Sequence, residues 1–418
     1  RHGVTINENN NNTHLLYVDD LVLVSESATG MQVLLDNLAD YCKKWHLLIN
    51  SQKSQVMIIH PNRRSRLNVN NPQFSIDGEN LEIVDSYKYL GHVISNSLKT
   101  HNTMYDHLAT QSQRAMHALK ERIKSTVGYL PPKISLKMFD THILPILDYN
   151  SEIWFPNKEI DVLERIQLKF LKNLLGVRNQ TSSVAVLADT GRFPLIYRQQ
   201  ASAIKYWNRL KSENCPLLLR KCYDVQVSLY RNNQPCWLTR IHQVTDSLNI
   251  NDDEIPASII TKLYEQAQSK MLTDINDNVK NPKLRTHKLF KQELCLESYL
   301  NYNLPKYLYR IIARFRLSSH NLHIELGRHK RPYVVAEERI CKRCDTNDTE
   351  DEFHCLIICR NWETARMDLY QAAYKHIEDF TIFHPKEQLL KIMINKNSEM
   401  IYALGKFLNI VLKTDNIV

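Results

Sequence analysis

A chain of 418 residues with 43% hydrophobic and 24% charged residues can bury a sizeable core in roughly two to four structural units. Nine glycines argue against a glycine-rich β sandwich, and nine cysteines are too sparse for a disulfide-stapled secreted scaffold. The net charge of +9 suits a polyanionic partner such as nucleic acid, although a merely basic soluble protein explains it equally well.

Nothing in the sequence predicts a membrane or secretory segment. No basic stretch followed by an apolar one opens the chain, and no apolar run reaches the ~20 residues that cross a bilayer. The closest run, residues 401–412, is interrupted by Lys406 and Asn409. We therefore expect an intracellular protein, in the nucleus or cytoplasm, with no membrane partner. Because the first residue is Arg1 and not Met, we expect the sequence to begin inside a longer reading frame.

The N-terminal segment predicts a hairpin that carries two acidic residues. Asparagines crowd residues 7–12, which is typical of a turn or loop. Two short apolar runs follow, at residues 15–18 and 21–24, and they flank Asp19 and Asp20. This pattern predicts a β-hairpin with both carboxylates at or beside its turn.

The next hundred residues combine one helix with extended segments. Apolar side chains recur at helical spacing over residues 31–45, and Ser27 or Thr29 can cap the N-terminus of that helix. Residues 56–59 predict a buried strand, and residues 87–94 predict another extended segment.

From residue 102 onward the pattern is helical. Apolar stripes predict helices at residues 102–123, 131–143, 160–175 and 196–210. Pro131 and Pro132 fit the start of the second helix, and Gly176 fits the end of the third. Residues 215–301 are typical of helices with longer loops. The fold class that follows is α+β.

The sequence Tyr17-Val18-Asp19-Asp20 carries the clearest chemical signal. Carboxylate oxygens are the ligands that Mg²⁺ prefers, and a turn between two apolar strands holds such ligands rigidly. In nucleotidyl transfer, two metal ions bind the attacking 3′ oxygen and the leaving phosphate oxygen. An Asp-Asp pair by itself is usually an ordinary β-turn, but the flanking strands and the following helix favour the metal site.

Residues 15–24 resemble the catalytic hairpin of reverse transcriptases, whose signature is Tyr-x-Asp-Asp. Three further blocks follow in the order of that family and resemble its non-LTR retrotransposon, jockey-like branch. They are the Asn-Ser-Gln-Lys-Ser palm segment at 50–54, the Tyr-x-Tyr-Leu-Gly segment at 87–91, and the thumb segment at 139–154. The likeness covers most of the chain.

The resemblance implies roles for five residues. Asp19 would be a catalytic Mg²⁺ ligand with Asp20 as its acidic partner, and Lys53 would approach the leaving pyrophosphate. Gly91 would let the backbone approach primer or thumb closely, and Tyr17 would stack beneath the primer end. The alternatives are a surface charge for Lys53, a bulge glycine for Gly91 and a plain strand aromatic for Tyr17.

One departure from the family pattern puts activity in doubt. The first catalytic aspartate of the family lies on an earlier palm strand, but none of the 18 residues before Asp19 is an aspartate. The fingers and much of the nucleotide pocket are also missing. Because a two-metal site without its bridging ligand orients nothing, we expect the chain alone to be inactive.

Four residues near the C-terminus have the spacing of a tetrahedral zinc site: Cys341, Cys344, His354 and Cys359. A Cys-x2-Cys pair forms a tight knuckle, which a short helix closes with His and Cys to give a structural Zn²⁺ site. Cys355 adjoins the histidine, and we expect it to face away. The alternative is a chance cluster of free thiols. The arrangement resembles the zinc knuckle near the C-terminus of non-LTR reverse transcriptases.

A basic and aromatic stretch precedes this cluster. Cations neutralise phosphates and aromatic faces stack on unpaired bases, so the stretch predicts nucleic-acid contact. The alternative is a solvated basic helix whose aromatic side chains belong to the core. The residues concerned are Lys306, Tyr307, Tyr309, Arg310, Arg314, Phe315, Arg316, Arg328, Lys330, Arg331 and Tyr333.

Together these patterns predict part of an RNA-directed DNA polymerase that uses Mg²⁺, dNTPs, an RNA template and a DNA primer or target. The missing N-terminal half would be a further partner. The alternative is an inactive nucleic-acid-binding remnant that acts through thumb and zinc knuckle. The expected divisions are half a palm at 1–95, a helical thumb at 96–214, a helical connector at 215–330, a CCHC zinc knuckle at 331–365 and C-terminal helices at 366–418.

Overall fold

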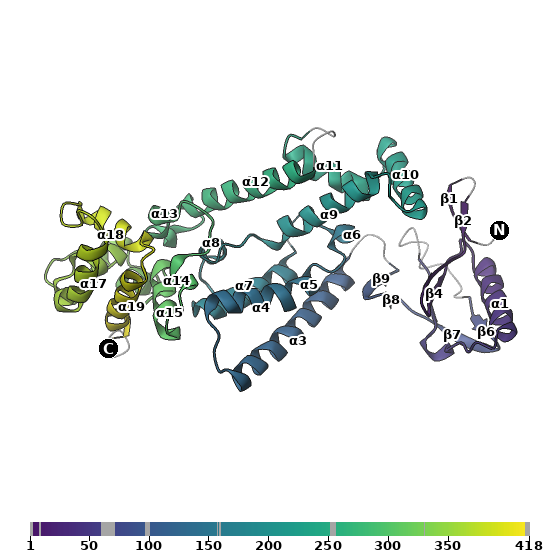
Figure 1. Ribbon diagram of the computed structural model, residues 1–418, viewed down its shortest axis with the longest axis horizontal. Helices are drawn as coiled ribbons and strands as arrows, with labels where there is room; N and C mark the ends of the chain where they lie inside the picture. The colour runs from purple at the N-terminus through teal and green to yellow at the C-terminus, as the bar shows by residue number, and fades with distance from the viewer. Residues whose placement is uncertain are drawn as a thin grey trace. The chain divides into compact units, whose positions relative to one another are not determined.

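The computed structural model describes residues 3–7, 10–59, 72–96, 101–156, 158, 160–250, 256–329 and 331–413. It is a helix-rich fold with small, mostly antiparallel sheets, which is the α+β composition predicted from the sequence (Figure 1). The chain divides into two compact units. The first comprises Arg1–Thr110, Tyr149–Lys158 and Gln199–Ile259, and the second comprises Gln111–Asp148, Glu159–Arg198 and Ile260–Val418.

The strands of the first unit form short ribbons. The hairpins are β1 with β2, β3 with β4, and β8 with β9, and β7 lies between β5 and β6 in a three-stranded sheet. Only the β5–β7 pair is parallel among the described strands. Their bounds are β1 Val4–Asn7, β2 Asn10–Asn12, β3 His14–Tyr17, β4 Asp20–Leu23, β5 Gln55–Val56, β6 Phe74–Ile76, β7 Glu79–Ile83, β8 Ser86–Tyr89 and β9 His92–Ser95.

Helix α1, Ala28–Lys44, packs on the small sheet of this unit. Its N-cap is Ser27, whose hydroxyl accepts a hydrogen bond from the backbone N–H of Gly30 at 3.1 Å. This satisfies one of the free donors at a helix N-terminus, so the capping role falls to Ser27 and not Thr29. Leu35 contributes from the helix and Phe74 from the sheet to one small apolar cluster.

Residues 87–94 form a hairpin and not the single extended segment predicted. Strand β8 pairs with β9 in the register Tyr89↔His92, so Leu90 and Gly91 are its two-residue turn. Both have positive φ, 47° and 81°. Two such residues in sequence suit the right-handed twist of a hairpin, and Gly supports this conformation without strain.

Short helical pieces complete the first unit. They are α6 Ser151–Trp154, α10 Leu217–Arg231 and α11 Trp237–Ser247, together with parts of α3 Asn102–Thr126, α9 Leu195–Lys211 and α12 Pro256–Asn276. The Arg240 guanidinium donates to the carbonyl oxygens of Ile153 and Phe155 at 3.2 and 3.1 Å. A cation at these carbonyls stabilises the C-terminal end of α6.

The second unit is almost entirely helical and holds the large apolar core. Pro132 lies at the first position of α4, and Gly176 ends α7 with φ 66°, as predicted from the sequence. The remaining helices are α4 Pro132–His142, α5 Leu144–Leu147, α7 Asp161–Leu175, α8 Ser183–Asp189, α13 His287–Phe290, α14 Ser298–Asn301, α15 Lys306–Arg316, α16 His323–Leu326, α17 Glu363–His376, α18 Pro385–Ile394 and α19 Ser398–Lys413.

Buried ion pairs cross this core. Arg316 donates to the carboxylate of Asp189 at 2.9 Å and to that of Glu297 at 2.8 Å. Glu352 accepts from Arg285 at 2.9 Å and lies 2.8 Å from His320. Burial alone would raise the pKa of Asp189 and Glu352, but the neighbouring cations outweigh burial and hold both pKa values well below their ordinary range.

Some predicted elements differ from the structure. The stretch at 7–12 lies partly in strands β1 and β2, and residues 8 and 9 lie outside the described residues. The strand predicted at 56–59 pairs only over Gln55–Val56. None of the helices in the described ranges is long and apolar enough to cross a bilayer.

Candidate functional site

The acidic turn lies at the tip of the β3–β4 hairpin. Tyr17 pairs with Asp20 and Leu16 pairs with Leu21, so Val18 and Asp19 form the two-residue turn. Asp19 is therefore in the turn and Asp20 is the first residue of β4. Both carboxylates are exposed. The hairpin predicted from the sequence thus presents two adjacent carboxylates to solvent.

Backbone strain marks the same turn. Val18 has φ 57°, a left-handed conformation that a β-branched residue rarely adopts. The crowding between its Cβ and the carbonyl costs about 1–2 kcal/mol. Such strain concentrates at functional sites, where the surrounding structure holds a conformation that the chain would otherwise avoid.

Within the described ranges, no third carboxylate joins Asp19 and Asp20 in a metal-binding group. Two carboxylates alone can attract a divalent cation, but a two-metal site needs further ligands to fix both ions. The hairpin is therefore an incomplete metal site as the described residues present it.

Of the other residues assigned to this site, Lys53 lies in a separate local structure and Tyr17 in the hairpin itself. Lys53 ends a short 3₁₀ turn, Ser51–Lys53, and its backbone N–H donates to the Asn50 side chain at 3.1 Å. Its ammonium makes no hydrogen bond or ion pair with Asp19 or Asp20 among the described contacts. Tyr17 is exposed at the end of β3.

Gly91 is in close contact with Tyr149. The Tyr149 hydroxyl donates to the carbonyl oxygen of Leu90 at 2.5 Å. A Cβ on Gly91 would lie 3.0 Å from that hydroxyl oxygen. The glycine therefore allows both the turn and the approach of Tyr149, and the bulge alternative is wrong.

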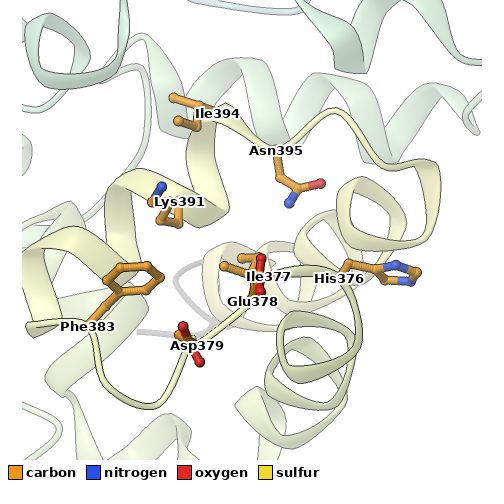
Figure 2. A pocket seen from close by; sticks show the side chains of 8 residues that line it. All are labelled: His376, Ile377, Glu378, Asp379, Phe383, Lys391, Ile394 and Asn395. Atoms are coloured by element: carbon orange, nitrogen blue, oxygen red, sulfur yellow. The ribbon is translucent and has the colours of Figure 1, made fainter.

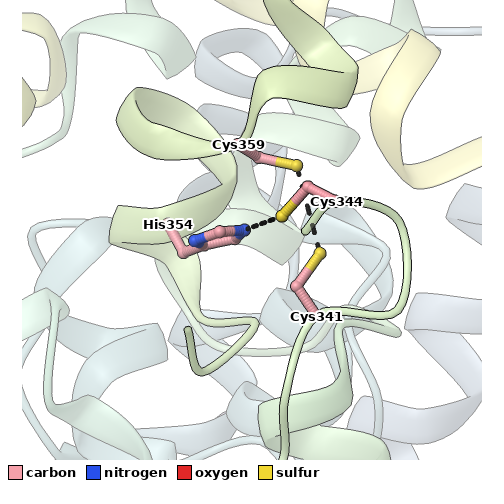
Figure 3. Close-up of side chains that lie close together, drawn as sticks. All are labelled: Cys341, Cys344, His354 and Cys359. Carbon is pink, nitrogen blue, oxygen red and sulfur yellow. Dashed lines mark hydrogen bonds between the residues drawn. The ribbon is translucent and has the colours of Figure 1, made fainter. Parts of the chain in front are cut away.

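The four predicted zinc ligands meet in the second unit (Figure 3). The ligand atoms of Cys341, Cys344, His354 and Cys359 all lie within 4.8 Å of one another. The Sγ atoms of Cys341 and Cys359 are 4.0 Å apart, and Cys344 Sγ is 3.4 Å from His354 Nε2. Tetrahedral bonds of normal length to Zn²⁺ would place such atoms about 3.8 and about 3.6 Å apart. The donor set and its spacing therefore fit zinc.

Local structure holds these ligands in place. Cys341 N–H donates to the carbonyl oxygen of Asp348 at 2.8 Å, beside the bridge between Ile340 and Thr349. His354 begins a single π-helical turn, His354–Ile358, and its N–H donates to the Asp351 carboxylate at 2.7 Å. The short helix predicted from the spacing is present as this π-helical turn.

Electrostatics at the cluster favour neutral ligands when no cation is bound. Burial raises the pKa of Cys341 to about 12 and raises the pKa of Cys359, and burial lowers the pKa of His354. Burial also opposes ionisation of Cys344, but hydrogen bonds from Thr346 lower its pKa. Zinc binds thiolates and neutral imidazole, so binding would release thiol protons.

Cys355 does not belong to this group. Its side chain is buried in the apolar core of the second unit, next to the ligands in sequence but outside the set that converges. The prediction that it faces away from His354 therefore agrees with the structure. Asp348 was not predicted: its carboxylate lies 3.7 Å from Nδ1 of His354, beyond hydrogen-bond distance, and this nitrogen has no hydrogen-bond partner among the described residues.

The basic stretch must be corrected at three positions. Arg316 is 3% exposed and ion-paired with Asp189 and Glu297, so it is unable to contact a phosphate. Tyr309 and Phe315 are each 1% exposed and belong to the core. The core alternative is therefore right for these aromatic residues.

Several other candidate residues in the described ranges reach the surface, whereas Arg328 pairs with the buried carboxylate of Glu325 at 3.1 Å. Arg314 and Arg331 are exposed, and Arg310 is half-buried. Tyr307 is 52% exposed. Lys330 lies outside the described residues.

An open cavity of about 420 Å³ lies near the end of α17 and along α18 (Figure 2). Its charged groups are the carboxylates of Glu378 and Asp379 and the ammonium of Lys391. His376 Nε2 bonds to the Glu399 carboxylate at 2.7 Å.

Comparison with known proteins finds a family match over the segment that contains the acidic hairpin. Residues 4–94 match the reverse transcriptase (RNA-dependent DNA polymerase) family. A transposon-derived protein of Caenorhabditis elegans is 29% identical over 168 residues, which are 40% of this chain and 58% of that protein. The chain thus spans somewhat more than half the length of this curated relative. These likenesses identify residues 4–94 as a reverse-transcriptase-like segment in a chain with a transposon-derived relative.

Proposed function

We propose that the chain is the C-terminal part of a non-LTR retrotransposon reverse transcriptase, an enzyme that copies RNA into DNA by two-metal nucleotidyl transfer. The observation that carries the proposal is the strained Tyr17-Val18-Asp19-Asp20 turn, which exposes two adjacent carboxylates within the reverse-transcriptase-like segment. Its substrates would be dNTPs, an RNA template and a DNA primer or target.

In this proposal the hairpin supplies two of the acidic ligands. Mg²⁺ bound there would stabilise charge on the attacking and leaving oxygens. Asp19 would hold the metal from the turn, and Asp20 would support it from the first position of β4. The left-handed backbone at Val18 would direct the Asp19 carboxylate toward the metal ion, and the exposed ring of Tyr17 would stack on the primer end. Lys53 would come near the pyrophosphate only when substrate is bound.

We propose that the isolated chain does not polymerise, because no third carboxylate joins the pair among the described residues. The assay is dNTP incorporation on a primed RNA template with Mg²⁺. We expect no product from the chain alone. Product that disappears in the Asp19→Ala variant would show that the isolated chain is already complete.

The polymerase assignment itself is tested by adding a polypeptide with the fingers and the first palm aspartate of a related enzyme. Primer extension should then appear and should be lost in Asp19→Ala and Asp20→Ala. Asp40→Ala is a matched control, since Asp40 is an exposed carboxylate on α1 outside the hairpin. Extension that survives both hairpin substitutions would overturn the proposal.

A second candidate function is non-enzymatic binding of nucleic acid through thumb and zinc knuckle. The converging donor set of Cys341, Cys344, His354 and Cys359 favours it, because a zinc knuckle can fold and act without the acidic hairpin. This candidate predicts that Asp19→Ala leaves the biological effect of the chain unchanged. Failure of that variant in a retrotransposition assay would favour the enzyme.

The finer assignments belong to this proposal as well. We propose a palm half at 1–95, a thumb at 96–214, a connector at 215–330, a zinc knuckle at 331–365 and C-terminal helices at 366–418. We also propose that the protein acts in the nucleus or cytoplasm, where thiols stay reduced and available to zinc. Imaging of the tagged chain tests the location.

A further inference from the structure

Three cations form a stripe along the solvent side of α15. Lys306, Arg310 and Arg314 are spaced four residues apart, so each lies about one helical turn from the next. Helix α15 contains no Asp or Glu. The opposite side of the helix is buried against the core, which leaves this stripe as its outer surface.

Two cations from distant parts of the sequence extend the stripe. The backbone N–H of Arg178 donates to the hydroxyl oxygen of Ser319, three residues after α15, at 2.9 Å. Partial burial lowers the pKa of the Arg314 guanidinium, and repulsion from Arg310 and Arg178 lowers it further. Burial likewise lowers the pKa of Lys306, with further repulsion from Arg310 and Lys120. Lys120 comes from α3, and Arg178 follows α7. We call these five residues the cationic strip.

The cationic strip is not neutralised. Over the described ranges, no ion pair involves any of its five members. Elsewhere in the same unit, arginines pair with carboxylates, as Arg192 does with Asp140 at 2.7 Å. Gathering five unpaired like charges opposes folding, so an anionic partner would relieve a real repulsion.

Two of the guanidinium groups are also held in place. Arg314 Nε donates to the carbonyl oxygen of Gly176 at 2.8 Å, and its two Nη atoms make no hydrogen bond to a described residue. Arg310 donates to the carbonyl oxygens of Leu174 and Asn173 at 3.3 and 2.7 Å. These bonds stabilise the end of α7 and also fix the side chains, so less entropy is lost when a phosphate binds.

We propose that the cationic strip of Lys120, Arg178, Lys306, Arg310 and Arg314 binds the phosphate backbone of single-stranded nucleic acid. The strip would be a nucleic-acid contact separate from the acidic hairpin and the zinc cluster. Only the choice of nucleic acid as the partner rests on the proposed function. An exposed aromatic residue favours a single strand: Tyr307, also on α15, is 52% exposed, and the Lys413 ammonium lies 5.7 Å from its ring centroid. Its ring can stack on an unpaired base.

The test measures binding of the zinc-loaded chain to a labelled single-stranded oligonucleotide by fluorescence anisotropy at several salt concentrations. The variant is the triple substitution Lys120→Gln/Arg178→Gln/Lys306→Gln, which leaves the two arginines that cap α7 intact. Each lost phosphate contact lowers the log–log salt slope by about 0.7, or about 2 for three contacts. At 0.1 M salt this corresponds to roughly a 100-fold loss of affinity.

The matched control removes three charges elsewhere: Lys43→Gln/Arg165→Gln/Lys375→Gln. These side chains are 63%, 77% and 63% exposed, and each pairs with a carboxylate. We expect the control to bind almost as the wild type does. Equal losses in the two triple variants would overturn the proposal, since net charge alone would then explain binding.

Further binding measurements distinguish single-stranded nucleic acid from duplex DNA and from anionic membranes. Tyr307→Ala should weaken binding about 5-fold or more, whereas duplex DNA and anionic lipid vesicles should bind less tightly than the single strand. Equal or tighter binding of duplex or vesicles would overturn the single-strand assignment. This experiment measures binding and not catalysis. A negative binding result therefore does not affect the primer-extension test of Asp19 and Asp20. Likewise, a chain that fails to polymerise could still show the expected binding.

Discussion

The acidic hairpin and the Cys/His cluster are both short groups of polar residues, but the fold surrounds them very differently. In the hairpin, Leu16, Tyr17 and Val18 are 67%, 61% and 82% exposed. In the cluster, Cys341, His354 and Cys359 are 4%, 2% and 0% exposed. The hairpin is a two-stranded ribbon, whereas the cluster is part of the large core of the second unit.

This difference indicates how much each site depends on other groups. A two-stranded hairpin with exposed apolar side chains is only marginally stable and cannot by itself fix a metal site. A set of four converging donors, three of them buried, is preorganised and needs only the ion. We therefore expect the cluster to work in the isolated chain and the hairpin to require additional ligands.

The largest expected effect is loss of zinc from the cluster. Purified chain should contain one Zn²⁺, and Cys359→Ser should abolish it and destabilise the second unit. Structural zinc contributes an apparent free energy on the order of 10 kcal/mol in small domains, although a large core lowers that share here. Metal analysis and thermal unfolding provide the measurements.

Cys355→Ala is the control for this experiment. Cys355 is also buried in the core, but it lies outside the converging donor set. The variant should keep its zinc while losing some stability through the small cavity left behind. Full zinc content in Cys359→Ser would show that the assigned ligands are wrong.

A pair of arginines on α15 sharpens the contrast between buried and exposed polar groups within one helix. Arg316→Met should lower the free energy of unfolding by about 3–5 kcal/mol, because it removes the arginine that pairs with the fully buried carboxylate of Asp189. Arg314→Met removes the hydrogen bond from an exposed guanidinium to the carbonyl oxygen of Gly176 at the C-terminal end of α7. Its loss should lower the free energy of unfolding by about 1 kcal/mol or less. Urea denaturation compares the two, and similar losses would contradict the assigned burial.

Acid should affect the second unit through its low-pKa carboxylates. The pKa of Asp189 and of Glu352 is depressed in the fold, where Arg316 and Arg285 outweigh burial. Their contribution is fully present above an unfolded pKa of about 4 and is lost as the pH falls below it. Urea midpoints between pH 7 and pH 2 should therefore drop below about pH 4. In Glu352→Gln the drop should be shallower, and an unchanged profile would contradict this role.

The smallest effect is expected at the hairpin. Asp19→Asn and Asp20→Asn change exposed side chains and should alter the free energy of unfolding by less than about 0.5 kcal/mol. Both should nevertheless abolish primer extension once the missing ligands are supplied. A loss of more than about 1 kcal/mol in either variant would indicate a structural role for these carboxylates.

Local sequence patterns determined much of this protein. Helical periodicity predicts the four long helices between residues 102 and 210 close to their observed bounds. Short-range spacing predicts the group of Cys341, Cys344, His354 and Cys359, which converge in the structure. The Asp19-Asp20 hairpin followed in the same way. These features depend on residues fewer than about 20 positions apart, so a linear pattern contains them.

Only the tertiary structure decided which arginine and lysine side chains are exposed and able to bind an anionic partner. Arg314 and Arg316 are equivalent in sequence, yet Arg316 points into the core to meet Asp189, 127 residues away, while Arg314 stays exposed. Arg178 joined the cationic strip only because the end of α7 packs against α15 and the following loop. Burial of a charge depends on partners brought together by packing over long sequence distances, and residue type or local spacing does not encode those partners.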